Sequence, residues 1–350
     1  MHPTPPTDGA HDAGHPAELA GDTAGLPRLR RRGCPWCGST RLRTPLRVPD
    51  PGRRGAGALG VDECRDCAHV FRVPHRTEAF PAVPRPHAPD PCPDGPAERV
   101  LAGRAGARRH QAAARAMLPF PEPESWLDIG TGHGYFPEAA RELHPYTSFD
   151  GLDPSHRVEE AQAAGRVEEA HRGHLTDPEI IGRLRSRYDV VSMLHHLERT
   201  PDPRAELRAA LTVLRPGGHL LIEAADPDCA FRALLGRRWA PYGRPGHLHL
   251  MPLRNLLAEL EALGCTVRRT DRREPHTPYD LAGALAPALA RVPPAPGTPR
   301  RPLRTALRGA AAPLLATATA LDHTLAPLAR RTRFANAYRI VARTPPSERP

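Results

Sequence analysis

The glycine-rich turn within residues 127–136 constrains the fold of this chain more than any other feature. Apolar residues precede the turn and predict a buried strand, and glycine then stands at every second position, as Gly130, Gly132 and Gly134. Residues 137–143 follow and are compatible with a helix. Glycine permits positive φ and lets a ligand lie against the main chain. A strand, a glycine turn and a helix N-terminus together predict a cradle of nucleotide size at the carboxyl edge of a parallel sheet.

The spacing of these glycines differs from that of the dinucleotide fingerprint, G-x-G-x-x-G. The third glycine comes one residue early, and Tyr135 stands at its expected position. Asp128 precedes the first glycine, and a carboxylate there disfavours a pyrophosphate but suits a cationic amino-acid ligand. A turn without a ligand stays open at this point, because short glycine motifs recur by accident.

The segment from Asp128 to Gly134 resembles motif I of the class I S-adenosylmethionine (SAM) methyltransferases, in which an acidic residue precedes x-G-x-G-x-G. The resemblance implies an α/β fold built on a Rossmann-like, seven-stranded sheet. It also implies SAM as a cofactor, bound by Asp128, Gly130, Gly132, Gly134 and Tyr135.

In that family, a second strand ends in an acidic residue that accepts hydrogen bonds from the ribose hydroxyls. Residues 147–152 are strand-like and lead to Asp153, about 20 residues past the glycines, as expected for a ribose-binding acid. Asp150 is a rival that lies further from the end of the strand. The loop 174–177, which contains Asp177, fits the segment that meets the adenine, although an ordinary surface loop is an equal alternative.

The apolar run Tyr188–Leu194 is rich in β-branched residues, as is typical of a strand buried on both faces. The resemblance places Leu194 at the cofactor. His195 and His196 follow at the carboxyl end, where the methyl group of SAM would lie. Histidine changes its charge near neutral pH, which suits a general base. His195 is therefore the candidate base and His196 its rival, although either could simply hydrogen-bond the loop.

The remaining elements occur in the order that the family requires. The resemblance covers residues ~97–275 and ~334–343. The last two strands should form an antiparallel hairpin, which distinguishes this fold from a dehydrogenase domain. The other expected strands lie at residues 166–170, 219–223, 265–269 and 337–342.

Four cysteines form two C-x2-C knuckles: Cys34 with Cys37, and Cys64 with Cys67. The gap between the knuckles is slightly longer than in the common zinc pattern. Four thiolates satisfy tetrahedral zinc in a closed, non-catalytic site. Zinc binding supplies on the order of 10 kcal/mol of folding energy, which a small segment with few apolar residues needs. Disulfides or a redox pair are alternatives, but we find neither a secretory signal nor a strand–helix frame to favour them.

The composition divides the chain into segments. Pro, Gly, Asp and His dominate the start of the chain, and proline is dense after the second knuckle. A further segment separates the last two strands and is too long for a loop. We expect a disordered tail (1–30), a zinc ribbon (31–73), a Pro-rich linker (74–96), a SAM-binding methyltransferase core (97–276), a helical insertion (277–333) and a final strand with tail (334–350).

The net charge of +10 comes from arginine without any lysine. Codon bias in a GC-rich genome produces such a surface without a nucleic-acid partner. Arginine-rich runs at 28–32 and 41–47 flank the first knuckle and favour RNA binding. Aromatic residues, at 5% of the chain, are scarce for base stacking and oppose it. No apolar run reaches the roughly 18–20 residues of a membrane helix.

We therefore expect a bacterial, cytoplasmic, SAM-dependent methyltransferase with SAM and Zn²⁺ as cofactors. Its acceptor should be a small molecule, a sugar or a natural-product intermediate, because the arrangement resembles bacterial ribbon-plus-methyltransferase enzymes that include some sugar C-methyltransferases. One alternative is an rRNA or tRNA methyltransferase whose ribbon grips RNA. Another is a SAM-binding adaptor without catalysis. The sequence leaves open the oligomeric state and whether O, N or C receives the methyl group.

Overall fold

The computed structural model describes residues 33–43, 46–49, 58–72, 96–244, 246–289 and 300–346. The expected tail lies outside the described residues, as does the expected linker except for Pro96.

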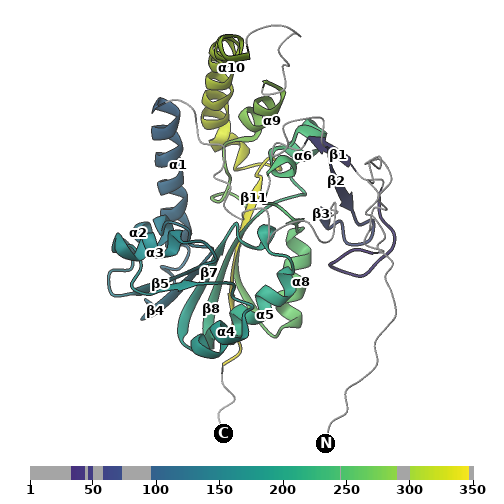
Figure 1. Cartoon of the computed structure of the whole chain (residues 1–350). Coiled ribbons are helices and arrows are strands. Elements are labelled where there is room, and N and C mark those ends of the chain that lie inside the picture. Colours follow the sequence, from purple (N-terminus) through teal and green to yellow (C-terminus); the bar gives the residue numbers. More distant parts are fainter. Residues whose placement is uncertain are drawn as a thin grey trace, which may run out of the picture.

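A mixed sheet of seven strands forms the centre of the molecule (Figure 1), in the order β10-β11-β8-β7-β4-β5-β6. The five strands from β8 to β6 in this order are parallel, whereas β11 runs antiparallel to both of its neighbours, β8 and β10. The α/β class I methyltransferase fold expected from the sequence is thereby confirmed. The strands are β4 (Ser125–Ile129), β5 (Ser148–Asp153), β6 (Ala170–Arg172), β7 (Tyr188–Leu194), β8 (Leu214–Ala225), β10 (Thr266–Asp271) and β11 (Ala337–Arg343).

Helices cover both faces of this sheet (Figure 1). Side chains alternate between the two faces of a strand, so Trp126 of β4 packs with the helices on one side and Leu127 with those on the other. On the Trp126 side lie α1 (Pro96–Arg115), α2 (Tyr135–Arg141) and α3 (Arg157–Ala163). On the Leu127 side lie α4 (Pro178–Leu184), α5 (Pro203–Val213) and α8 (Leu253–Ala262).

Local signals in the sequence explain where α5 begins. Asp202 caps the helix, because its Oδ1 accepts hydrogen bonds from the backbone N–H groups of Arg204 (3.0 Å) and Ala205 (3.1 Å). Pro203 occupies the first helical position, where no backbone donor is needed. The turn η1 (Leu197–Arg199) comes just before this helix and joins it to β7. Strand β7, η1 and α5 therefore form one continuous unit at the carboxyl edge of the sheet.

A second, antiparallel sheet has the order β1-β2-β3-β9. Its strands are β1 (Leu46–Pro49), β2 (Ala58–Glu63), β3 (Val70–Arg72) and β9 (His249–Leu250). The sequence analysis did not anticipate that β9, from the second half of the chain, would complete the sheet of the ribbon. Trp36 and Phe71 of the ribbon pack in the same apolar cluster as Met251 of the core. The ribbon thus shares its packing with the large sheet.

The insertion between the last two strands forms α9 (Asp280–Leu289) and α10 (Arg300–Ala329). The carboxylate of Asp322 in α10 accepts hydrogen bonds from the backbone N–H groups of Leu281 (3.0 Å) and Ala282 (2.9 Å). This contact satisfies free donors at the start of α9. Between β8 and β9 lie the short helices α6 (Ala230–Leu235), η2 (Gly236–Arg238) and α7 (Ala240–Gly243). Within the described ranges, we find no helix that combines the length and the apolar character needed to cross a membrane.

Two strands differ in position from the expectation. The third parallel strand begins at Ala170 rather than near residue 166, although the Gly151 N–H already bonds to the Glu169 carbonyl (2.9 Å). Strand β8 begins at Leu214, earlier than the expected residue 219, because Leu214 already pairs with Tyr188 of β7. Its backbone bonds to the end of the chain: the N–H of Thr344 donates to the carbonyl of Gly218 (2.9 Å).

Candidate active site and metal centre

The glycine turn follows β4 at the carboxyl edge of the sheet. Gly130, Gly132 and Gly134 have φ angles of +75°, +54° and +75°, a region that side chains disfavour. A Cβ atom on Gly130 would lie 2.6 Å from Nδ1 of His196. A Cβ atom on Gly132 would instead meet no atom within 4 Å among the described residues. A side chain at Gly130 would therefore clash with the protein, whereas a side chain at Gly132 would enter open space.

Asp153 ends the neighbouring strand β5 and contacts this turn directly. Its buried carboxylate accepts a hydrogen bond through Oδ2 from the Gly132 N–H (3.0 Å). Oδ1 accepts from the backbone N–H (2.8 Å) and the hydroxyl (2.6 Å) of Ser155. The rival, Asp150, lies in a different network, where its Oδ2 accepts from the Tyr188 hydroxyl (2.8 Å). The structure therefore brings Asp153, rather than Asp150, to the glycine turn.

Asp128 is buried beneath the turn. The hydroxyl of Ser192 donates to its Oδ1 (2.6 Å) and in turn accepts from Nε1 of Trp126 (3.0 Å). Burial raises the pKa of Asp128 to about 7, although the bond from Ser192 opposes the shift. The charges of His196 and Asp153 also act on this pKa, which places the three residues in one neighbourhood. A cation bound nearby would favour the ionised form of Asp128.

The other expected cofactor residues lie at the same edge. Tyr135 begins α2 with an exposed ring, 4.8 Å below the guanidinium of Arg166. Leu194 ends β7 and is partly buried against the apolar cluster on the Trp126 side. Asp177 precedes α4, and its Oδ2 accepts a local hydrogen bond from the His174 N–H (2.9 Å).

The two histidines after β7 differ in their contacts. His195 has a φ of +53°, rare for a residue with a side chain, and its N–H donates to the Glu223 carbonyl (2.9 Å). Its Nδ1 lies 3.0 Å from Oε1 of Glu198. Its buried Nε2 has no hydrogen-bond partner among the residues that the structure describes. His196 has its Nε2 2.8 Å from Oε1 of Glu206, and its Nδ1 faces Gly130.

Glu198, in η1, was missed by the sequence analysis. Its side chain is fully buried, and Oε1 also accepts from the Ala225 N–H (2.8 Å). Burial raises the pKa of Glu198, but the hydrogen bonds from His195 and from Ala225 outweigh it and hold the pKa below its usual value. The three-residue spacing between His195 and Glu198 was a signal that could have found this pair.

Two further imidazoles lie near His195: His247, which is buried, and His110, which is partly buried. His110 of α1 has its pKa lowered to about 3, by burial and then by the charges of Arg109 and His195. Burial also lowers the pKa of His247 well below its usual value, assisted by nearby positive charges. Within the described part of the chain, neither ring nitrogen of His247 has a hydrogen-bond partner. Both imidazoles are therefore neutral at physiological pH.

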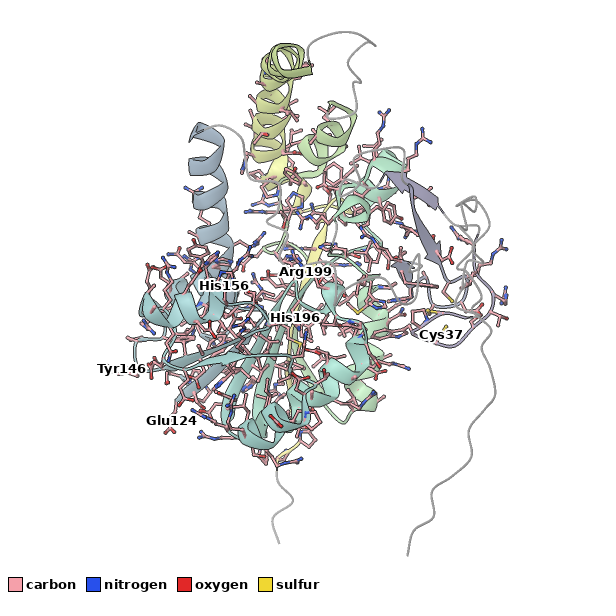
Figure 2. The ribbon with its side chains drawn as sticks, in the orientation of Figure 1. Cys37, Glu124, Tyr146, His156, His196 and Arg199 are labelled. Atoms are coloured by element: carbon pink, nitrogen blue, oxygen red, sulfur yellow. The ribbon has the colours of Figure 1, made fainter. Side chains whose placement is uncertain are left out.

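The carboxyl edge of the sheet faces the interior of the molecule. Figure 2 shows His196 and Arg199 near its middle, whereas Glu124 and Tyr146, which precede β4 and β5, lie at the opposite edge. The candidate site is therefore surrounded by the glycine turn, η1, α1 and the loop that contains His247. Trp239 is fully buried and packs against Tyr242 with ring centroids 5.1 Å apart.

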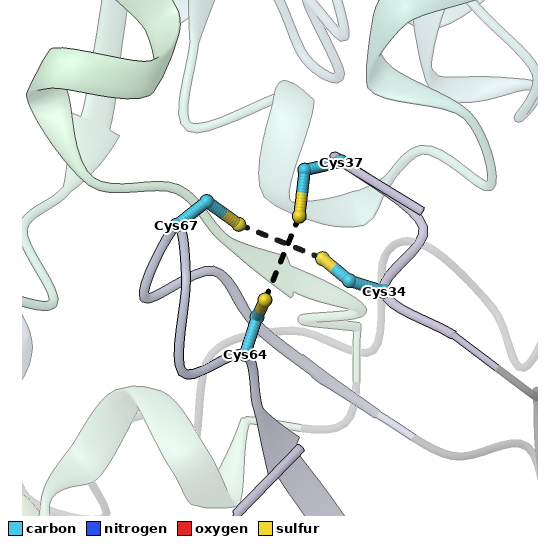
Figure 3. A group of neighbouring side chains, drawn as sticks. All are labelled: Cys34, Cys37, Cys64 and Cys67. Atoms are coloured by element: carbon cyan, nitrogen blue, oxygen red, sulfur yellow. Dashed lines mark hydrogen bonds between the residues drawn. The ribbon is translucent and has the colours of Figure 1, made fainter. Parts of the chain in front are cut away.

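The four knuckle cysteines converge at one point of the ribbon (Figure 3). Their sulfurs lie within 4.8 Å of one another, with Cys34–Cys67 and Cys37–Cys64 at 3.6 Å. Tetrahedral zinc with Zn–S bonds of about 2.3 Å needs sulfurs about 3.8 Å apart. His69 is not one of the converging groups, because its Nε2 lies 3.0 Å from Nδ1 of His249. The four thiols therefore fit a zinc ion.

The two knuckles have the same backbone. In each, the residue after the second cysteine adopts positive φ, Gly38 at +76° and Ala68 at +56°. Its N–H donates to the carbonyl of the first cysteine, at 2.9 Å for Cys34 and 3.0 Å for Cys64. Burial raises the pKa of Cys34 to about 11 and also raises that of Cys67. A bound cation would be needed to hold these thiols as thiolates.

Residues 101–270 match the model of a family described as "Methyltransferase domain". The chain is 31% identical over 150 residues to the ubiquinone biosynthesis O-methyltransferase of Aeromonas salmonicida, covering 41% of this chain and 63% of that protein. It is 33% identical over 129 residues to the protein of the same name from Marinobacter nauticus, covering 32% of this chain and 50% of that one. A solved SAM-dependent methyltransferase from Archaeoglobus fulgidus aligns with a TM-score of 0.45 and 17% identity, over 70% of this chain and 98% of that one.

The similarity to methyltransferase domains covers residues 101–270, which contain the glycine turn and strands β4 to β8. The chain spans 63% and 50% of the lengths of the two curated relatives.

Proposed function

We propose that this protein transfers the methyl group of SAM to a small-molecule acceptor. The observation that carries the proposal is the hydrogen bond between Asp153 and the Gly132 N–H, which joins the acidic end of β5 to the open side of the glycine turn. This pairing provides acceptors for a ribose and space beside the main chain for an adenosyl group.

Different residues at the carboxyl edge would bind different parts of SAM. The carboxylate of Asp153 would accept hydrogen bonds from the ribose hydroxyls. Asp128 and the turn would face the charged amino-acid part, because a cation offsets the burial of this carboxylate. The remaining cofactor contacts are assigned to Tyr135, Asp177 and Leu194. SAM supplies an electrophilic methyl group when it is bound.

His195 is the residue that we assign to accept a proton from the acceptor. Its Nε2 is buried and has no partner among the described residues, whereas both ring nitrogens of His196 face protein groups. A base must be placed within hydrogen-bond reach of the proton that it removes. His196 is better suited to support Gly130.

A small-molecule acceptor is favoured over RNA. The curated relatives are named as O-methyltransferases of ubiquinone biosynthesis, which points to an oxygen on a small molecule. On the described part of the ribbon, acidic partners neutralise Arg41, through Asp66 (2.7 Å), and lie near Arg43, through Glu63 (3.6 Å). The first arginine-rich run, 28–32, lies outside the described residues.

The four cysteines are proposed to hold one structural Zn²⁺. They fit its geometry and leave no position for a substrate, so the metal would stabilise the ribbon and take no part in methyl transfer.

The acceptor class can be tested with radiolabelled SAM. The purified protein would be incubated with a small-molecule extract and, separately, with an RNA fraction, each with a boiled-protein control. The proposal predicts label in the small molecules. Label in RNA alone would contradict it, and binding of SAM without any transfer would favour a non-catalytic adaptor.

A further inference from the structure

Each of the two histidines after β7 contacts a carboxylate, but the two pairs are built differently. Glu206 meets His196 through Nε2, which leaves Nδ1 toward the glycine turn. Glu198 meets His195 through Nδ1, which leaves Nε2 without a protein partner in the described ranges. Only the second arrangement presents a ring nitrogen to a ligand.

Glu198 is held both at its side chain and at its backbone: Oε1 and the backbone carbonyl oxygen each accept a hydrogen bond. Its Oε1 accepts from the Ala225 N–H at the end of β8 (2.8 Å). Its backbone carbonyl accepts from the Leu248 N–H, beside β9 (2.6 Å). The side chain is fully buried and can hardly reorient. Glu198 is therefore a rigid partner for His195.

The charge on Glu198 decides which nitrogen of His195 carries the proton. A carboxylate with a lowered pKa is ionised near neutral pH and can only accept hydrogen bonds. Nδ1 of His195 must then carry a hydrogen, and Nε2 keeps its lone pair. Two neighbouring imidazoles, His110 of α1 and His247 before β9, are neutral. The charged side chains around these rings include Glu198 and the arginines Arg72, Arg109, Arg199 and Arg244.

The backbone conformation of His195 also indicates that its side chain is held in a fixed position. A positive φ is unfavourable for a residue with a side chain and persists where the surroundings impose it. Here the surroundings are two hydrogen bonds, from the His195 N–H to Glu223 and from its ring to Glu198. Together they hold the imidazole at the carboxyl end of β7.

We propose that Glu198 is a positioning residue, which holds His195 as the Nδ1–H tautomer and stabilises its protonated form. This inference rests on the proposed function. As the acceptor atom bonds to the methyl carbon, the carbon–sulfur bond of SAM breaks and its electron pair stays on sulfur. The proton of the acceptor passes to Nε2 of His195, and the positive imidazolium is then paired with Glu198.

The tautomer can be measured without any acceptor. Long-range ¹H–¹⁵N NMR on protein labelled with ¹⁵N-histidine distinguishes the two ring nitrogens, and His195→Gln assigns the signal. The wild type should show hydrogen on Nδ1 and none on Nε2 near pH 8. In Glu198→Gln, protonation of Nε2 should require a lower pH than in the wild type, because the opposite charge is lost. A glutamine oxygen can still accept both hydrogen bonds.

Glu206→Gln is the matched control, because it removes the carboxylate of the other pair. It should leave the titration of His195 in place. A wild-type signal with hydrogen on Nε2, or a titration that moves with Glu206 instead of Glu198, would overturn the inference. The wild-type tautomer alone decides the matter if Glu198→Gln does not fold.

Activity gives a second readout, with whichever small-molecule fraction takes the label. Glu198→Gln should lower kcat at least about 10-fold, and the acidic limb of its rate profile should move to lower pH. The double variant with His195→Gln should be no slower than His195→Gln alone. Additive losses would contradict the inference. A wild type that labels no fraction would contradict the proposed function, while the NMR result would still decide the role of Glu198.

Discussion

At the scale of single residues, the turn glycines differ in what surrounds them. A side chain at Gly132 would enter open space, on the side of the turn where we propose that SAM binds. Gly132→Val should therefore weaken SAM binding by at least about 100-fold, or about 2.7 kcal/mol. The valine side chain would occupy the space proposed for the ligand. The φ of +54° at this position is also unfavourable for a β-branched residue. Isothermal titration calorimetry would measure the change.

Gly182→Ala is the control for this substitution. Gly182 lies in α4, and a Cβ atom there would likewise meet nothing within 4 Å among the described residues. This variant should bind SAM like the wild type and unfold at the same or a slightly higher temperature, because alanine favours the helix. Wild-type affinity in Gly132→Val would show that the ligand lies elsewhere.

Substitutions of the two acidic residues of β5, Asp153 and Asp150, should differ in their effects on SAM binding and on stability. Asp153→Asn should weaken SAM binding about 10-fold or more, because charged hydrogen bonds to the ribose are lost. Asp150→Asn should instead lower the unfolding temperature and leave SAM affinity unchanged, since Asp150 bonds to Tyr188 within the fold. Calorimetry and thermal unfolding of both variants check this contrast. A SAM affinity that falls only in Asp150→Asn would reverse the assignment.

The raised pKa of Asp128 predicts how the free energy of unfolding depends on pH. Its folded pKa of about 7 lies above that of an unfolded aspartate, about 3.9, so the folded protein binds the extra proton between these values. The free energy of unfolding should fall as the pH rises through this window. Asp128→Asn should make the decrease in the free energy of unfolding between about pH 5 and 7.5 smaller, by on the order of 1–4 kcal/mol. Urea unfolding without ligand measures both proteins, and an identical pH dependence would contradict the prediction.

At the scale of elements, the ribbon and the methyltransferase core meet through β3 and β9. Phe71 pairs with His249 across the two strands, and the Leu248 N–H bonds to Glu198. The knuckle that contains Cys67 lies just before β3, and the Cys67 carbonyl accepts from Asn255 of α8 (2.9 Å). Loss of metal should therefore loosen the loop beside the candidate base as well as the ribbon.

Metal analysis and hydrogen exchange test this coupling. The wild type should contain one zinc ion per chain, and chelation should lower the unfolding temperature and speed amide exchange at Leu248 and Leu250. Cys64→Ser should do the same. Cys265→Ser should keep its zinc, because Cys265 is buried but is not one of the four cysteines whose sulfurs converge. Metal-free protein with unchanged exchange at these amides would contradict the coupling.

At the scale of the whole molecule, the sequence predicts the large sheet well because its signals are local. Strand β7 follows from an apolar, β-branched run, and the turn after β4 follows from its glycines. The antiparallel placement of β11 was expected from the family resemblance and is confirmed.

The features that the sequence analysis missed depend on contacts between distant segments. Strand β9 is two residues long and exists because β3 pairs with it. The buried state of Glu198 depends on Ala225 and on the loop before β9, which no local pattern indicates. From the sequence alone, a glutamate that follows two histidines is expected to be exposed. Only the tertiary contacts show that Glu198 is buried.

The central claim is that the carboxyl edge around Asp153 and Gly132 binds the adenosyl group of SAM. A crystal of the protein soaked with S-adenosylhomocysteine tests it most directly. The account predicts the ribose hydroxyls within hydrogen-bond distance of the Asp153 carboxylate, and the thioether sulfur on the side of His195. A vacant glycine turn, or this compound bound at another place on the molecule, would contradict the account.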